Sequence, residues 1–542
     1  MNQMMVLSVV AAALASATAC GDDFEAKRLA LLDRQRDFIY NTDGNDMLRY
    51  TKRKPVTVDG FESQRLDYTK GTAISSVSYC PAISFAYFTL FRAGYPATNS
   101  IAQYSTPDQY CGATAFWEKG LDNLSMAIDF AHRNGMLGNV SIRMNDSHDS
   151  WVSPIMRSPF KNLHPECMME SSPPQDKKPR YGTWTSVDYS EPLVQEEVRK
   201  FVRQFCENYD IDCLELDFCR HLVYLRSVYF GGIASEEETE SINALMREIR
   251  GIVANCGKKR GRPIIIQVRV ADSPEYCREL GLDIRSWMEH KYVDAVIGGC
   301  YFRLNDWGRM ADLAHSYGVR FYASMDETRI PWQCRHNKPA SREIPGRGSV
   351  AFDLARCAEA MNAGCDGIFM FNIEGRELAA HTKVAPRETD GLDKIYFATE
   401  RGGGGYSVKG YLNGGIRHRN LAYIDPSAPL PVEPKQVVAF GIRIGDNFAK
   451  AAAKGLKPVV VAMALTGRKE SKDVRIVMNG KVLSAAKNND GLFFYPVEPA
   501  LVKKGINSFY FANLSSEKTT FNDFAVSIYY VKREKGERSA GQ

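Results

Sequence analysis

The sequence predicts an α/β protein in which an eight-stranded (β/α)8 TIM barrel is followed by a small all-β sandwich domain. Over residues 21–400, short apolar runs rich in β-branched residues alternate with longer segments whose apolar residues recur at helical spacing. After about residue 400, short alternating runs separated by turn residues replace that pattern. A chain of 542 residues is long enough for two such domains.

Eight strands and six long helices are expected in the barrel domain. The strands cover residues 36–46, 73–80, 137–149, 209–221, 262–272, 293–302, 319–328 and 365–375. The helices cover residues 115–135, 192–210, 237–257, 283–292, 306–318 and 350–364. Because a helix follows most of the strands, the strands are expected to pair in parallel and close into a barrel. An open doubly wound sheet is the alternative, but the Gly-rich phosphate loop that usually follows its first strand is missing.

The second domain is expected to be a β-sandwich over residues 436–535. A glycine cluster, RGGGGY at 401–406, and the proline-rich stretch PSAPLPVEPK predict a linker over 401–435. Six alternating runs follow it, and the Asn-Gly pair of MNGK predicts a hairpin between two of them. Such a series of short strands is typical of a sandwich.

The first 20 residues form an apolar stretch that ends in small residues before Cys20, which is typical of a signal peptide. ATAC also resembles a bacterial lipobox, although no Lys or Arg precedes the apolar run and Ala17 stands where Leu is usual. We expect export to the periplasm, the outer membrane or the extracellular space. A lipidated Cys20 would provide membrane attachment, and a simple secretory signal is the alternative.

The net charge of +5 is small for this length and the basic residues are scattered, so nucleic acid is not expected as a partner. The 13 cysteines include no CxxC pair and no Cys/His zinc spacing. Neither a metal nor a cofactor is expected.

Polar and charged side chains end almost every expected strand of the barrel. In chain order they are Asn41, Asp43, Asp46, Arg143, Asn145, Asp146, His148, Glu215, Asp217, Arg220, His221, Arg269, Tyr301, Asp326, Glu327, Arg329 and Asn372. Active sites of such barrels lie at the C-terminal ends of the strands, so these side chains are expected to surround one mouth. A ring of carboxylates, arginines, amides and aromatic groups suits a carbohydrate substrate.

Glycoside hydrolysis needs one carboxyl group that is protonated and one that is ionised. Asp217 with Glu327 is the preferred catalytic pair, because their strands are expected to lie on opposite sides of the barrel. Glu215 and Asp326 remain alternatives for the same two roles. The other residues of the ring are expected to bind substrate.

Two of these groups have structural alternatives. Asp217 could form only an internal ion pair with Arg220, and Arg143 could pair with Asp146 in the same way. His148 has no HxH partner and no acid–His spacing typical of a metal site.

Six stretches resemble the bacterial TIM-barrel proteins called glycosyl-hydrolase-10-like, a family of glycosidase-like barrels. They are FIYNTDGND, SIRMNDSH, IDCLELDFCRH, YFRLNDW, SMDETR and GIFMFNIEG, and the likeness covers roughly residues 30–400. The resemblance implies a glycoside hydrolase acting on a poly- or oligosaccharide, often with an appended sandwich, but no particular sugar. The stretch at 209–221 lacks the Asn-Glu pair of the large retaining glycosidase clan, so acid and nucleophile stay unassigned. A non-catalytic glycan-binding surface lipoprotein and a metal-dependent hydrolase on the same barrel are the alternatives.

Overall fold

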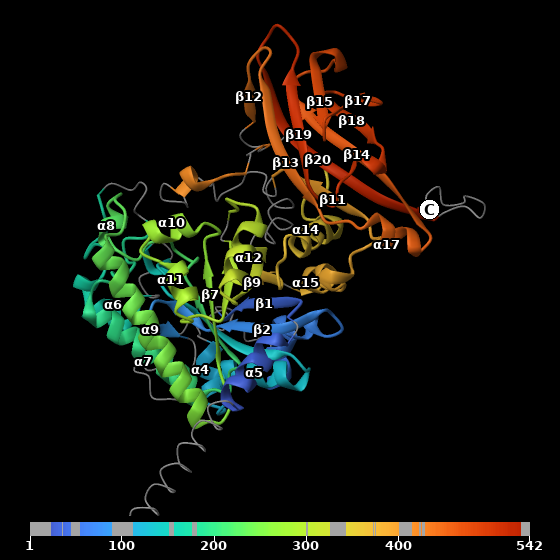
Figure 1. The fold of residues 1–542 in the computed structure, drawn as a ribbon. Helices are drawn as coiled ribbons and strands as arrows, with labels where there is room; N and C mark the ends of the chain where they lie inside the picture. The colour runs from blue at the N-terminus through green and yellow to red at the C-terminus, as the bar shows by residue number, and fades with distance from the viewer. Residues whose placement is uncertain are drawn as a thin grey trace, which may run out of the picture.

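The computed structural model shows a barrel with a β-sandwich stacked on it (Figure 1). It describes residues 23–34, 36–44, 55–88, 112–150, 157–175, 182–299, 302–325, 343–371, 373, 375–399, 415–421, 424, 426 and 429–532.

Eight parallel strands close the barrel, which confirms the predicted fold class. They are β1 (Phe38–Asp43), β2 (Ile74–Cys80), β5 (Leu137–Arg143), β6 (Cys213–Asp217), β7 (Ile265–Val270), β8 (Ala295–Gly298), β9 (Arg320–Met325) and β10 (Gly367–Phe371). Their order around the barrel follows the chain, and β10 closes on β1. At this closure β10 begins with Gly367, because a Cβ there would lie 1.9 Å from the carbonyl oxygen of Arg36.

The helices that cover the barrel lie close to their expected positions. The main ones are α2 (Val58–Arg65), α4 (Gly112–Trp117), α5 (Asn123–Arg133), α7 (Pro192–Asn208), α9 (Glu236–Lys259), α10 (Pro274–Glu279), α11 (Ile284–Glu289), α12 (Trp307–Ser316), α14 (Val350–Asn362) and α15 (Gly375–His381). The helix expected over 115–135 is two helices, α4 and α5. The chain breaks there because Gly120 has a φ of +69° and the side chain of Asp122 caps α5.

The sandwich consists of two antiparallel sheets. One contains β11 (Lys394–Phe397), β12 (Leu430–Val432), β14 (Leu456–Thr466), β17 (Lys487–Asn489), β18 (Leu492–Val497) and β20 (Thr519–Lys532). The other, called the four-stranded sheet below, has the order β13 (Val437–Ile444), β19 (Gly505–Asn513), β15 (Val474–Met478) and β16 (Lys481–Leu483). The predicted hairpin joins β15 to β16, and Asn479 and Gly480 both have positive φ as an Asn-Gly turn requires.

The sandwich begins earlier in the chain than the sequence suggested. β11 falls inside the span assigned to the barrel and β12 inside the span assigned to the linker, yet both pair with β20. β11 has four residues and β12 has three, whereas β20, with which both pair, has fourteen.

Helix α14 lies between the barrel and the sandwich (Figure 1). Cys357 and Ala360 belong to the barrel core, Ala355 and Ala358 to the sandwich core, and Phe352 to a smaller cluster that includes strand β11. Ion pairs fasten the same junction. The guanidinium of Arg347 donates two hydrogen bonds of 2.6 and 2.7 Å to the carboxylate of Asp523, on β20. Arg443, on β13 of the sandwich, pairs with Asp306 of the barrel.

Nine cysteines among the described residues are buried and carry free thiols. Within the same residues, no helix has the length and apolar character needed to cross a membrane.

Candidate active site

Two layers of polar side chains fill one half of the barrel interior. In the lower layer, Glu215 accepts hydrogen bonds from Asn41 Nδ2 (2.7 Å) and Gln267 Nε2 (2.6 Å), one on each carboxyl oxygen. Asn41 also contacts the hydroxyl of Ser141 at 3.0 Å. Ser141, Glu215 and Gln267 are neighbours on β5, β6 and β7, and the side chain of Asn41 on β1 reaches them inside the barrel, because alternate residues of a strand face the barrel axis.

The upper layer lies two residues further along the same strands, at their C-terminal ends. Here Asp217 is next to Arg143 on one side and Arg269 on the other. The Oδ2 atom of Asp217 accepts a hydrogen bond of 2.8 Å from Arg269, and Oδ1 accepts one of 2.8 Å from the backbone N–H of Cys219. Arg269 stacks on the ring of Phe371, 4.4 Å away, so an aromatic wall faces the charged half of the barrel.

Arg143 holds two further carboxylates. It donates to Asp43 at the end of β1 (2.7 Å) and to Asp146 just beyond β5 (2.8 Å). Burial acts to raise the pKa of Asp43, but the charges of Arg143, Arg65 and Arg220 outweigh it and the pKa is lowered. Burial is likewise outweighed at Asp146, where His148 and Arg143 hold the pKa well below its ordinary value. Both side chains are therefore ionised at neutral pH.

The two histidines near this group are neutral. Arg220, which is always a donor, donates to Nε2 of His148 at 2.6 Å, so the ring proton is on Nδ1 and donates to Asp146 at 2.6 Å. His221 Nδ1 accepts from the backbone N–H of Ser147 at 3.2 Å, which places its proton on Nε2. Burial is the main cause of the lowered pKa of both rings.

Asp146, His148 and His221 lie close enough to hold a metal ion, since one ligand atom from each lies within 4.8 Å of the others. Their hydrogen bonds do not fit that function. A ligating imidazole must offer the metal a lone pair and donate its other N–H. The lone pair of His148 accepts from Arg220, and that of His221 accepts from a backbone N–H. The arrangement suits a network of hydrogen bonds instead.

The residues of this site differ in access to solvent. Asp217 is 1% exposed and Asp43 is 8% exposed. Arg220 is also 8% exposed, and His221 is half-buried. The rim therefore offers one ionised acceptor and two N–H donors, which is the combination that hydrogen-bonds sugar hydroxyls.

Two buried carboxyl groups of the barrel have raised pKa values, as a general acid requires. Burial raises the pKa of Glu215, and it raises that of Asp272 to about 6. Glu215 has both oxygens hydrogen-bonded in the lower layer, and Asp272 accepts from the backbone N–H groups of Leu304 and Asn305. Neither group is exposed, so neither belongs to the rim.

The structure brings together most of the ring that the sequence predicts. The group contains Asp43, Arg143, Asp146, His148, Asp217, Arg220, His221 and Arg269, with Asn41 and Glu215 one layer below. The expected pair of Arg143 with Asp146 is present. Asp217, however, contacts Arg269 and not Arg220, because strand register places β6 beside β7.

Asn145 was expected to bind substrate, but its side-chain amide forms hydrogen bonds with the backbone instead. Its Nδ2 donates to the carbonyl oxygens of Val187 (2.9 Å) and Val223 (2.5 Å), and its Oδ1 accepts from the N–H of Val187 (3.0 Å). It is fully buried and fastens two loops together.

The other predicted site residues lie outside the described part of the chain. They are Asp46, Tyr301, Asp326, Glu327, Arg329 and Asn372. β9, which precedes Asp326 and Glu327, is three places from β6 around the barrel, and β10 is the strand directly opposite. The expectation that the two acidic strands face each other across the barrel was therefore wrong by one strand.

Ser141 and Gln267 were missed from the sequence. Each precedes a predicted arginine by two residues, so the alternation of strand side chains was the available signal.

No protein-family model matches the chain. A search of curated proteins likewise finds no match. Solved structures similar to the chain include a cycloisomaltooligosaccharide glucanotransferase from Paenibacillus, with 9% identity and a TM-score of 0.34 over 90% of this chain and 57% of that one. An alpha-amylase from Anoxybacillus, described as a new glycosyl hydrolase subclass, has 10% identity and a TM-score of 0.34 over 89% and 98%. A GH36 alpha-galactosidase from Geobacillus stearothermophilus, in complex with raffinose, has 12% identity and a TM-score of 0.33 over 92% and 56%.

Several of these similar structures are thus glycoside hydrolases. The chain spans little more than half the length of the glucanotransferase and the galactosidase. Identities of 9–12% concern the fold alone, and at TM-scores near 0.34 they carry no argument about chemistry.

Proposed function

We propose that the chain is a glycoside hydrolase that acts on a poly- or oligosaccharide at the C-terminal mouth of its barrel. The observation that carries the proposal is the group of three carboxylates, Asp43, Asp146 and Asp217, that arginines hold at the strand ends. Ionised carboxylates in a fixed, dry setting stabilise the positive charge that develops on a sugar ring during cleavage.

In this proposal Asp217 is the ionised member of the catalytic pair, as nucleophile or base. Arg269 and the Cys219 N–H orient its two oxygens. The general acid is proposed to be Glu327, with Asp326 as the alternative, because the described carboxyl groups with raised pKa values lie away from the rim. Asp43, Arg220 and His221 would hydrogen-bond substrate hydroxyls.

We further propose that the chain belongs to the glycosyl-hydrolase-10-like barrels. This proposal is supported by the resemblance of its six strand-end stretches to that family. We also propose that the protein is exported, with Cys20 as the point of lipid attachment. The support for this is the apolar stretch before Cys20 in the sequence.

The test uses protein lacking residues 1–20, incubated with a panel of polysaccharides and aryl glycosides, with released reducing sugar or aryl alcohol as the readout. Asp217→Asn and Glu327→Gln are each expected to lower turnover by roughly a hundredfold or more. Glu248→Gln, a matched change in an exposed surface ion pair, should leave turnover unchanged. Unchanged turnover in both site variants would refute the site.

A non-catalytic glycan-binding protein is the second candidate, and the burial of Asp217 favours it. Both oxygens of this side chain already accept hydrogen bonds, whereas the accessible residues are ones that bind hydroxyl groups. This candidate predicts glycan affinity without product, and that affinity should fall in Asp43→Asn and Arg220→Gln.

A further inference from the structure

The outer face of the four-stranded sheet exposes a band of apolar side chains. Across the sheet, Ala439, Tyr510, Val477 and Val482 are direct neighbours on β13, β19, β15 and β16. Val437 and Ile506 point to the same side, since they lie at alternate positions of their strands. Val437, Val482, Ile506 and Tyr510 are 41% to 57% exposed. An apolar band with an aromatic residue at its centre, open to solvent, marks an interaction surface.

Exposed positive charges lie at both ends of this outer face. None of its four strands contains Asp or Glu. Lys435 precedes β13, Arg475 lies on β15, and Lys503 and Lys504 directly precede β19. All four side chains are exposed, and no carboxylate of the described residues forms an ion pair with them.

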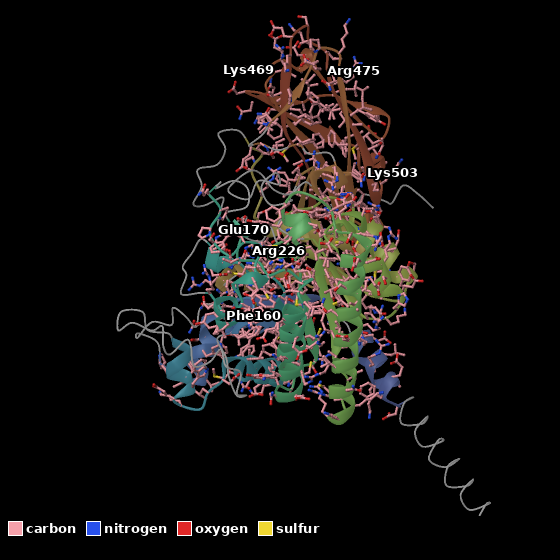
Figure 2. The ribbon with its side chains drawn as sticks, turned by 90° about the vertical axis from the view of Figure 1, so that its left-hand side faces the viewer. Phe160, Glu170, Arg226, Lys469, Arg475 and Lys503 are labelled. Carbon is pink, nitrogen blue, oxygen red and sulfur yellow. The ribbon has the colours of Figure 1, made fainter. Side chains whose placement is uncertain are left out.

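Basic residues outnumber acidic residues in the sandwich as a whole. Residues 429–532 contain fifteen Lys and Arg against eight Asp and Glu. Figure 2 shows Arg475 and Lys503 along one side of the sandwich, with Lys469 on the other side.

We infer that this outer face binds an anionic polysaccharide, with the ring of Tyr510 against a sugar ring and the four cations against carboxylate or sulfate groups. An extended acidic polymer matches both the length of the sheet, which has cations at both ends, and its flat apolar centre. A second copy of the chain does not match. A two-fold contact would bring the cations of the two copies together, and like charges repel. The inference does not depend on hydrolysis in the barrel.

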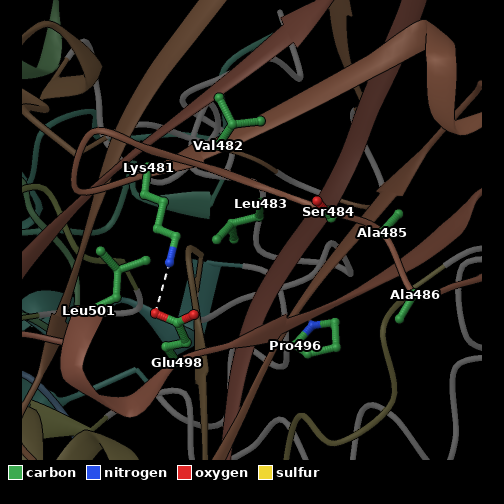
Figure 3. Close-up of a pocket in the computed structure, with 9 residues that line it drawn as sticks. All are labelled: Lys481, Val482, Leu483, Ser484, Ala485, Ala486, Pro496, Glu498 and Leu501. Atoms are coloured by element: carbon green, nitrogen blue, oxygen red, sulfur yellow. Dashed lines mark hydrogen bonds and ion pairs between the residues drawn. The ribbon is translucent and has the colours of Figure 1, made fainter.

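An open hollow of about 370 Å³ borders the β16 edge of this face (Figure 3). Lys481 points into it and pairs with Glu498 at 2.7 Å, so its charge is already balanced within the protein. Lys481 is therefore not one of the four cations assigned to the polymer.

The test is affinity electrophoresis of the full chain in gels that contain polygalacturonate, with dextran as the neutral polymer. Wild-type protein should be retarded by polygalacturonate at about 10 mM NaCl, and the retardation should disappear at about 500 mM. Arg475→Glu and Tyr510→Ala should each weaken binding about threefold to tenfold. Lys469→Glu and Tyr529→Ala are the matched controls, because Lys469 is on the other side and Tyr529 is equally exposed on β20.

Thermal midpoints equal to that of the wild type verify that the variants fold. The inference is overturned if polygalacturonate does not retard the protein at low salt, or if site variants and controls weaken equally. It is also overturned if phosphatidylglycerol vesicles bind the protein through Arg475 and Tyr510 while polygalacturonate does not, because the partner is then a membrane surface. Loss of hydrolysis in Asp217→Asn with unchanged retardation leaves the inference intact.

Discussion

Arg220 Nη2 and His148 Nε2 lie 2.6 Å apart, with the guanidinium as donor and the ring as acceptor. This contact joins the rim of the barrel mouth to the buried acid below, because the other ring nitrogen donates to Asp146. A protonated His148 would place an N–H against the N–H of Arg220.

His148 is accordingly expected to titrate below its ordinary pKa of 6.5, since burial lowers its pKa and the charge of Arg220 adds to that effect. As the pH falls, the unfolded chain then takes up this proton before the folded chain does. The contribution to the free energy of unfolding is therefore complete above about pH 6.5 and declines below it. Nitrogen-detected NMR, with His148→Gln to assign the signals, gives both tautomer and pKa. A proton on Nε2, or a pKa at or above 6.5, would contradict the assignment.

Replacing Arg143 should be among the more costly single changes in the barrel. Arg143→Met leaves Asp43 and Asp146 buried without their shared cation, and breaking a buried pair costs about 3–5 kcal/mol. Urea unfolding measures this loss. Arg199→Met, which removes a half-buried surface cation that also contacts two acids, should cost less than about 1 kcal/mol. Equal losses in the two variants would show that the Arg143 network is not a source of stability.

The Asn145→Ala variant tests whether Asn145 has a structural or a substrate-binding function. The change removes three hydrogen bonds to the backbone, and we expect a loss of roughly 2–4 kcal/mol in the free energy of unfolding. The KM of the folded protein should not change. A raised KM with unchanged stability would return Asn145 to the substrate-binding group.

Arg347 and Asp523 should be coupled across the junction of barrel and sandwich. Arg347→Met and Asp523→Asn are each expected to cost about 3–5 kcal/mol, because each leaves a buried charge without its counter-ion. The double variant should lose less than the sum, with a coupling energy of about 1–3 kcal/mol from chemical unfolding. The exposed pair of Lys518 and Glu433 is the control cycle, with an expected coupling near zero. Additive losses at Arg347 and Asp523 would mean that the contact adds nothing of its own.

The fold could be predicted almost completely from the sequence, because alternation of strand and helix patterns leaves few topologies. The barrel strands fall inside their expected ranges, and the pair of Arg143 with Asp146 follows from their short separation along the chain. The partner of Asp217 could not be predicted, since a carboxylate at a strand end can reach the next loop or the next strand. Only the register of β6 on β7 selects Arg269.

Two other differences between the expectation and the structure have physical causes. Asn145 looks like a site residue because it follows a barrel strand, and its true partners lie 42 and 78 residues further along the chain. The early start of the sandwich was missed because β11 has too few residues to show an alternation of its own.

Helix α14 has a consequence for how the molecule can be divided. A domain that can be moved to another protein contains all the residues of its own hydrophobic core, but the core of the sandwich includes Ala355 and Ala358 from a helix of the barrel. Cutting the chain at residue 400 would strip β20 from β11 and open the interior on both sides of the cut. The barrel and the sandwich should therefore unfold in a single transition in calorimetry. Neither domain can be exchanged, in evolution or by engineering, unless the sequence of α14 changes with it.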